Sequence, residues 1–184
     1  MSQTTSIVSD YDPTWRTAAA DLIAVLAPAL GSLASTIHHV GSTAIPGMMA
    51  KPVLDIDIEL APRSTVAAAT AVLTALGYTF EGDKGIPDRY AYRRSDPHVP
   101  CAGARAVWPA HHLYVCPHGS AELARHLRFR DRLRESAALR DEYIVIKRAA
   151  LRRAQGVRQV YVDEKAQLGA EFFARVVAAE DSMR

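Results

Sequence analysis

Residues 52–60 predict a β-strand with two different faces, because aliphatic and acidic side chains alternate from Leu54 to Leu60. The aliphatic positions are Leu54, Ile56, Ile58 and Leu60, and the acidic positions are Asp55, Asp57 and Glu59. A shift of the pairing by one residue would bury the acids, so the pattern fixes the register of this strand in its sheet. The chain must therefore build a sheet with one apolar, covered face and one face that carries carboxylates.

The other elements follow from periodicity and turn residues. Further strands are expected at residues 35–40, 78–80, 90–94 and 111–116, and helices at 13–27, 64–76, 120–137, 139–154 and 157–179. The first helix should begin at Asp12-Pro13 and the second should end at Gly77, while residues 95–107 predict a long loop. Because helices gather at the C-terminal end, the order predicts an α+β fold with a C-terminal helical layer, not a doubly wound sheet.

Length and composition indicate one ordinary domain over residues 1–184. Hydrophobic residues make up 49% of the 184 residues and charged residues 23%, which is typical of globular proteins. Cys101 and Cys116 form no Cys-x-x-Cys pair, which favours a reducing, cytoplasmic location. No uninterrupted apolar run approaches the ~20 residues of a membrane helix, and no signal-peptide pattern opens the chain, so no contact with a membrane is expected.

Asp55 and Asp57 are the candidate catalytic and metal-binding residues. A strand places them side by side on one face, where two carboxylates repel each other unless a cation lies between them. Hard divalent ions such as Mg²⁺ prefer such oxygen ligands. A solvent-facing edge strand with an acidic face would show the same Asp-x-Asp pattern, and the pattern alone does not separate the two interpretations.

Gly41 and Ser42 form a candidate phosphate-binding turn before this strand. Gly41 permits a close backbone approach, and Ser42 can donate its hydroxyl while the following amides bind a phosphate. Lys51 precedes Pro52, which favours an extended backbone at the rim of the acidic strand. Lys51 is therefore expected to screen the carboxylates or to contact a substrate phosphate; the alternative is a solvated loop lysine.

The spacing of these residues resembles a known superfamily. A Gly-Ser pair, twelve further residues and then Asp-Ile-Asp-Ile is similar to the pattern of the nucleotidyltransferases. The wider sequence resembles the GrpB family of nucleotidyltransferase-like proteins from residue 11 to about 175. The matching stretches are His-Val-Gly-Ser-Thr-Ala-Ile-Pro-Gly at 39–47, Lys51-Pro52, Asp55-Ile56, Tyr11-Asp12-Pro13-x-Trp15, Phe129-Arg130-Asp131-x-Leu133-Arg134 and Glu142-Tyr143-x-x-x-Lys147.

The resemblance implies a mixed β-sheet flanked by helices, a Gly-Ser turn that holds nucleotide phosphates, and paired acids that hold the metal. Active members of the superfamily usually carry a third carboxylate on a later strand, here residues 111–116. That segment contains His111, His112 and Tyr114 but no acid. His112 can bind a metal or a phosphate there but cannot supply the negative charge. A similar domain is also fused to dephospho-CoA kinases in some actinobacteria, where it need not be catalytic.

Helical geometry adds three candidate anion ligands. On each of the three C-terminal helices one cation lies on the face that should point inward: Arg130, Lys147 and Lys165. An unpaired buried charge is costly, so each needs an anion or a path to water. Internal partners such as Asp131 or Glu142 would satisfy them, but three cations beside a phosphate-type turn favour an anion site.

We therefore expect a Mg²⁺-dependent enzyme that binds a nucleoside triphosphate and transfers a nucleotidyl group to a small, unidentified acceptor, with Arg89 and Arg93 lining the acceptor side. The alternative is a non-catalytic module for nucleotide or phosphate binding, or for folding assistance, that retains the fold. Residues 120–160 hold 11 of the 22 Lys and Arg residues but only 5 of the 20 acidic ones. A pI near 8.6 with few interleaved aromatic residues still falls short of a nucleic-acid interface, so no nucleic-acid partner is expected.

Overall fold

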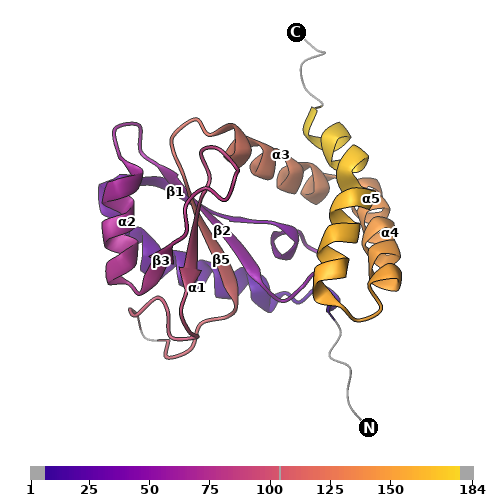
Figure 1. Ribbon diagram of the computed structural model, residues 1–184, viewed down its shortest axis with the longest axis horizontal. Coiled ribbons are helices and arrows are strands. Elements are labelled where there is room, and N and C mark those ends of the chain that lie inside the picture. Colours follow the sequence, from indigo (N-terminus) through magenta and orange to yellow (C-terminus); the bar gives the residue numbers. More distant parts are fainter. Residues whose placement is uncertain (1–6, 104, 179–184) are drawn as a thin grey trace.

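The computed structural model describes residues 7–103 and 105–178 of the chain. A five-stranded sheet lies at its centre, with the strand order β1-β2-β5-β4-β3 (Figure 1). Its strands are β1 (Ala34–Val40), β2 (Leu54–Leu60), β3 (Tyr78–Phe80), β4 (Tyr90–Arg94) and β5 (His111–Cys116). The central pair β2 and β5 is parallel, and the other neighbours are antiparallel. The mixed sheet and the α+β class expected from the sequence are thus confirmed.

The strand with the acidic face lies in the interior of the sheet, between β1 and β5. Asp55 pairs with Val40 on one side and His112 on the other, and Asp57 pairs with His38 and Tyr114. The solvated edge strand, the alternative interpretation of the Asp-x-Asp pattern, is therefore wrong. Because β2 has a neighbour on each side, side chains from β1 and β5 flank both carboxylates.

The aliphatic face of β2 packs against two helices, α1 (Thr14–Leu30) and α2 (Val66–Ala75). Leu54, Ile56, Ile58 and Leu60 are at most 1% exposed, as the alternating pattern requires. Leu22 and Leu26 of α1 and Leu73 of α2 belong to the same core cluster. This covered face holds the register of β2 and turns Asp55 and Asp57 toward the other side.

The C-terminal helices α3 (Ala121–Glu135), α4 (Ala137–Ala154) and α5 (Arg158–Ala178) form a separate layer (Figure 1). Ser120 and Ser136 cap α3 and α4 through their hydroxyl oxygens. The layer packs its aromatic residues around Ile45 and Met48, which follow the Gly41-Ser42 turn. This second core joins the turn to the helices. The end predicted at residue 179 for the last helix lies outside the described residues.

The first helix departs most from expectation. It continues through Pro28 to Leu30 instead of stopping at residue 27, and Gly31, at φ +53°, ends it. By length and composition alone, residues Thr14–Leu33 could also cross a membrane. Alanine and leucine keep the segment apolar on average although Arg16 and Asp21 interrupt it. In the fold, its Trp15, Ala19, Leu22, Leu26 and Leu30 are buried in the core.

Candidate functional site

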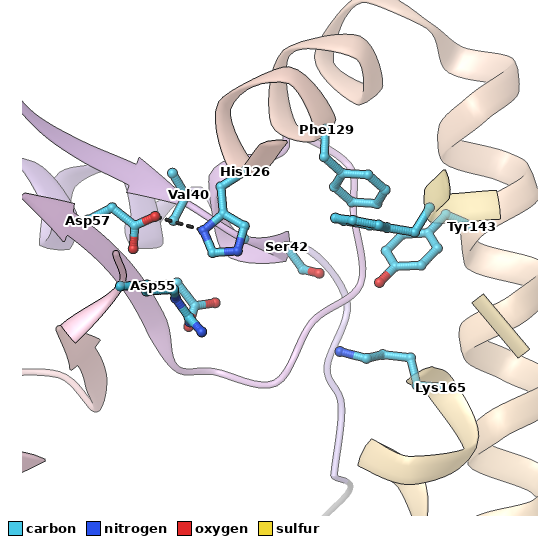
Figure 2. A pocket seen from close by; sticks show the side chains of 11 residues that line it. Val40, Ser42, Asp55, Asp57, His126, Phe129, Tyr143 and Lys165 are labelled. Carbon is cyan, nitrogen blue, oxygen red and sulfur yellow. Dashed lines mark hydrogen bonds and ion pairs between the residues drawn. The ribbon is translucent and has the colours of Figure 1, made fainter. Parts of the chain in front are cut away.

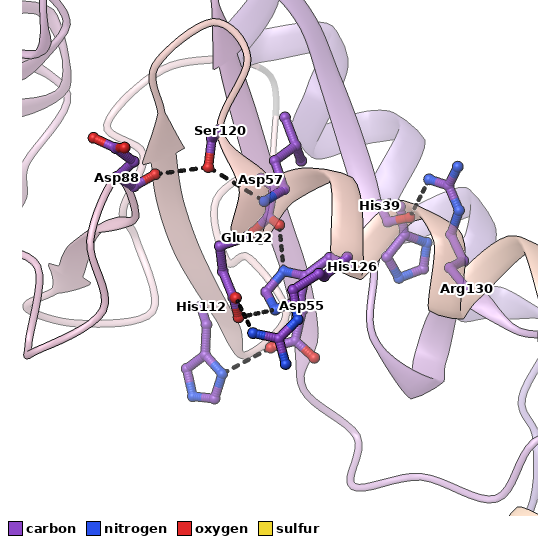
Figure 3. A network of polar contacts seen from close by, with 11 residues as sticks. His39, Asp55, Asp57, Asp88, His112, Ser120, Glu122, His126 and Arg130 are labelled. Carbon is purple, nitrogen blue, oxygen red and sulfur yellow. Dashed lines mark hydrogen bonds and ion pairs between the residues drawn. The ribbon is translucent and has the colours of Figure 1, made fainter. Parts of the chain in front are cut away.

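Asp55 and Asp57 occupy the sheet face that points toward the C-terminal helices, but their environments differ. The Asp55 side chain is 34% exposed, whereas the Asp57 side chain is completely buried. Each carboxylate has one oxygen bound to a histidine: Asp55 Oδ1 lies 2.9 Å from His112 Nδ1, and Asp57 Oδ2 lies 2.7 Å from His126 Nδ1 (Figure 3). Asp57 Oδ1 is buried and has no hydrogen-bond partner among the described residues.

His126 links Asp57 to a third carboxylate. Its other ring nitrogen, Nε2, lies 3.2 Å from Glu122 Oε1, one turn earlier on α3 (Figure 3). Only an imidazolium can donate hydrogen bonds to both carboxylates at once. His126 was not among the site residues named from the sequence. A signal was present, because His126 lies three residues from both Leu123 and Phe129, which form the buried face of α3.

Gly41 is required where the turn approaches β2. Its φ of +69° lies in the left-handed region, and a Cβ at this position would overlap Asp55 Oδ2. The next residues, Ser42–Ala44, form a short 3₁₀ turn. Gly41 therefore lets the turn lie directly beside the Asp55 carboxylate, as expected from the sequence.

Lys147 fixes this turn to α4. It is 1% exposed, and its Nζ donates hydrogen bonds of 2.7 Å to both Ser42 Oγ and the Met49 carbonyl oxygen. Both acceptors are neutral. Burial lowers the pKa of Lys147 well below its usual value; the positive charge of Lys165 adds to this effect and Asp55 opposes it. Lys147 thus holds both ends of the turn from within the protein.

Lys51 and Lys165 complete a group of cations around Asp55. Burial lowers the pKa of each lysine and is the largest cause of the shift. The carboxylate of Asp55 opposes the shift in both. The positive charge of Lys165 also contributes to the lowered pKa of Lys51. The positive charges of these lysines repel one another, and a bound anion would reduce that repulsion.

Two adjoining cavities lie on this face. The first, of about 220 Å³, is lined by Val40, Gly41, Ser42, Asp55, Asp57, Arg89, His126, Phe129, Tyr143, Lys165 and Phe173 (Figure 2). The second, of about 350 Å³, has Lys51, His112, Tyr114, Lys147 and Tyr161 in its wall. Four residues line both cavities: Ser42, Asp55, Arg89 and Lys165. We call these four residues the neck.

The structure brings together eight of the nine site residues named from the sequence. Arg130 is the exception, because it lines neither cavity. Its guanidinium makes paired contacts of 2.7 and 3.0 Å with the carboxylate of Asp131. It also donates to the His39 carbonyl oxygen at 3.1 Å (Figure 3). Of the two interpretations of Arg130, an anion ligand or an internal ion pair, the structure therefore shows the internal ion pair with Asp131. Arg93 also lies outside both cavities and pairs with Glu81.

The position opposite Asp57 on β5, where the third acid was sought, is occupied by Tyr114. The guanidinium carbon of Arg89 lies 3.5 Å from the centre of the Tyr114 ring. Burial raises the pKa of Tyr114, and Arg89 opposes that shift. Beside Asp57, β5 therefore carries an aromatic ring stacked with a cation instead of a carboxylate.

The donor set fits a hard cation with few protein ligands. Within residues 7–103 and 105–178, no group of three or more His, Cys, Asp or Glu side chains is arranged to hold a metal ion. Asp55 and Asp57 still offer two oxygen donors, one of them the unpartnered Asp57 Oδ1. Mg²⁺ commonly binds through one or two carboxylates and completes its shell with water and substrate phosphates. These two residues therefore fit Mg²⁺ only together with such a ligand.

Comparison with known proteins gives one consistent relationship. The family model described as GrpB protein matches residues 5–175. The UPF0157 protein YqkA of Bacillus subtilis is 36% identical over 112 residues, which are 61% of this chain and 30% of that protein. The UPF0157 protein BH1888 of Halalkalibacterium halodurans is 30% identical over 92% of this chain and 81% of its own length.

Two further similarities extend this result. A dephospho-CoA kinase of Mycolicibacterium paratuberculosis is 32% identical over 84% of this chain, but the match spans only 42% of the kinase. The crystal structure of the conserved protein GrpB from Enterococcus faecalis superposes with a TM-score of 0.71 at 24% identity and covers 93% of this chain and 94% of its own. At that identity the likeness establishes the fold alone.

Proposed function

The chain belongs to the GrpB family, and we propose that it binds a nucleoside triphosphate with Mg²⁺ and transfers the nucleotidyl group to a small acceptor. The observation that supports this proposal most strongly is the neck. Ser42, Asp55, Arg89 and Lys165 come from four separate segments and line both cavities. A hydroxyl, a carboxylate and two cations at one point suit a phosphoryl group with a divalent ion.

The two cavities suit the two halves of a nucleotide. The larger one has Lys51, Lys147 and Lys165 in its wall, which favours the phosphates. The smaller one has the rings of Phe129, Tyr143 and Phe173 in its wall, which favour a flat apolar group such as a nucleobase (Figure 2). The α-phosphate of a ligand lying across both cavities would then be at the neck.

In the transfer, an acceptor hydroxyl oxygen forms a bond to the α-phosphorus and its proton passes to solvent, while the bond from that phosphorus to the bridging oxygen breaks and pyrophosphate leaves with the electron pair. Asp55 and Asp57 would hold Mg²⁺, which stabilises charge on the phosphoryl oxygens when bound. His112 and His126 keep the two carboxylates oriented. Lys165 lies across the cavity from Asp55, where it can neutralise charge on the leaving pyrophosphate (Figure 2).

A second candidate is a non-catalytic nucleotide- or phosphate-binding module. The specific observation in its favour is Tyr114, which takes the β5 position opposite Asp57 and leaves that strand without an acid. The similarity to part of a dephospho-CoA kinase agrees with this candidate, because a domain attached to a kinase need not carry out chemistry of its own. Such a module would bind nucleotide but release no pyrophosphate.

Calorimetric titration with ATP, in Mg²⁺ and in EDTA, tests the proposal. Wild type should bind more tightly in Mg²⁺, and Asp55→Ala should abolish that gain. Glu59→Gln is the matched control, since Glu59 lies on the same face of β2 but lines neither cavity. Pyrophosphate release in the presence of a mixture of small acceptors separates the enzyme from the module. The proposal is wrong if millimolar ATP does not bind, or if binding is indifferent to both Mg²⁺ and Asp55.

A further inference from the structure

Arg89 is a cation of the neck that has no ion-pair partner among the described residues. It lies in the loop just before β4, and its guanidinium stacks on Tyr114. Among the described residues, the carboxylates that form ion pairs have other partners, and none lies within 4.0 Å of Arg89. Its Nε is buried and has no hydrogen-bond partner.

The neighbouring arginines on β4 have carboxylate or carbonyl partners, and Arg89 has none of these among the described residues. Arg93 pairs with Glu81 at 3.2 Å, and Arg94 donates to the carbonyl oxygens of Trp108 and Pro109 at 3.1 and 3.0 Å. Arg89 stacks on Tyr114 and also makes a hydrogen bond with that side chain, which orients the guanidinium but leaves other N–H groups available. A half-buried guanidinium without an anion is costly, and a ligand anion would remove that cost.

Lys165 lines the same two cavities from α5. An anion that passes from one cavity to the other must therefore pass both Arg89 and Lys165. Arg89 approaches from the sheet, beside Tyr114, and Lys165 approaches from the helical layer. This arrangement places one cation on each side of the neck.

We propose that Arg89 and Lys165 clamp one phosphoryl group of a phosphoric anhydride ligand, with affinity that does not require a divalent cation. The proposal rests on the phosphate-binding part of the proposed function and specifies it further. Because Arg89 and Lys165 both bring positive charge to the neck, the site attracts polyphosphate even without metal. Mg²⁺ then adds to an affinity that the protein already has.

Inorganic pyrophosphate in EDTA is the probe, because it has neither a base nor a metal. Arg89→Met should weaken its binding by roughly ten- to a hundred-fold, the range for a lost hydrogen bond between charged groups. Arg89→Lys should lose less, because it keeps the charge but not the planar fork. Arg93→Met is the matched control, since Arg93 is on the adjacent strand and lines neither cavity, and it should bind within about twofold of wild type. Thermal unfolding checks that each variant is folded.

Asp55→Ala separates this inference from the proposed function. It should remove the gain from Mg²⁺ in ATP binding but tighten pyrophosphate binding in EDTA, because a repelling carboxylate is gone. If folded Arg89→Met binds pyrophosphate as well as wild type does, the clamp is wrong even where Mg²⁺-ATP binding still depends on Asp55. If wild type binds pyrophosphate only when Mg²⁺ is present, the metal-independent affinity is refuted. If it binds neither probe, both proposals fail.

Discussion

Single side chains in this site serve more than one group at a time. His126 contacts both Asp57 and Glu122, and Lys147 holds Ser42 and Met49 together. Gly41 contributes by having no side chain, because Asp55 Oδ2 occupies the space that a Cβ would take. Any substitution here therefore alters the contacts of at least two other groups. An informative variant needs a control substitution that destabilises the fold to a similar extent.

Replacing Gly41 by alanine should displace the Asp55 carboxylate and abolish Mg²⁺-dependent ATP binding. The left-handed backbone alone costs about 1–2 kcal/mol for a residue with a side chain. Gly47→Ala is the matched control, because Gly47 lies in the next turn along the chain, also at positive φ (+80°), but has open space around its Cβ position. Urea unfolding and calorimetry on both variants measure the two effects. Equal loss of ATP binding in both would show that the close approach to Asp55 has no functional role.

At the scale of elements, strands were more predictable than helix faces. The alternation in β2 was enough to place Asp55 and Asp57 on one face, since a strand has a fixed period of two. On α3 the structure buries Leu123, Phe129 and Leu133 and turns His126, which was not named from the sequence, toward Asp57. Arg130 then meets Asp131. Small differences in helix rotation decide such contacts, and no local pattern reports a partner 69 residues away.

His111, the first residue of β5, ties that strand to two other segments. Its Nε2 lies 2.7 Å from the hydroxyl of Tyr78 on β3, and its Nδ1 lies 2.8 Å from the Pro109 carbonyl oxygen. Neutral imidazole satisfies both contacts if Nδ1 donates and Nε2 accepts. Burial lowers the pKa of His111 from 6.5 to about 4, and Arg94 adds to the shift. The folded protein therefore holds this histidine neutral at pH values where the unfolded chain is protonated.

This shift predicts a loss of stability on the acid side. Between pH 6.5 and about 4 the unfolded state binds more protons than the folded state, so the free energy of unfolding falls as the pH falls. His39, with its pKa also lowered to about 4 by burial, acts in the same window and direction. His111→Asn keeps an N–H near Pro109 but does not titrate. It should therefore reduce the slope of unfolding free energy against pH by about 1.4 kcal/mol per pH unit.

Urea unfolding of wild type and His111→Asn at several pH values measures that slope. At pH 7 the variant should be less stable by roughly 1–3 kcal/mol, because the Tyr78 hydroxyl loses its partner. Tyr78→Phe in both backgrounds separates this contact from the titration, since it removes the hydroxyl without changing the charge of residue 111. If the free energy of unfolding changes equally with pH in wild type and His111→Asn, then folding does not lower the pKa of His111 and this prediction is wrong.

At the scale of the whole molecule, the sheet separates two hydrophobic cores with different roles. The core under α1 and α2 fixes the register of β2, and the core among α3, α4 and α5 carries the turn through Ile45 and Met48. The cavities lie on the side of the second core, between sheet and helical layer. A ligand there would contact both parts, so its binding should stabilise their junction more than the opposite face.

Amide hydrogen exchange with and without Mg²⁺-ATP tests this asymmetry. Exchange within the first minutes reports local opening, and it should slow at Ser42–Ala44 and in the part of α5 around Lys165. Helix α2 is the internal control, because it packs on the other face of the sheet and lines neither cavity. In Asp55→Ala the slowing at both segments should be lost. Equal slowing in α2 and α5 would indicate general stabilisation, and slowing confined to α2 would place the ligand on the wrong side of the sheet.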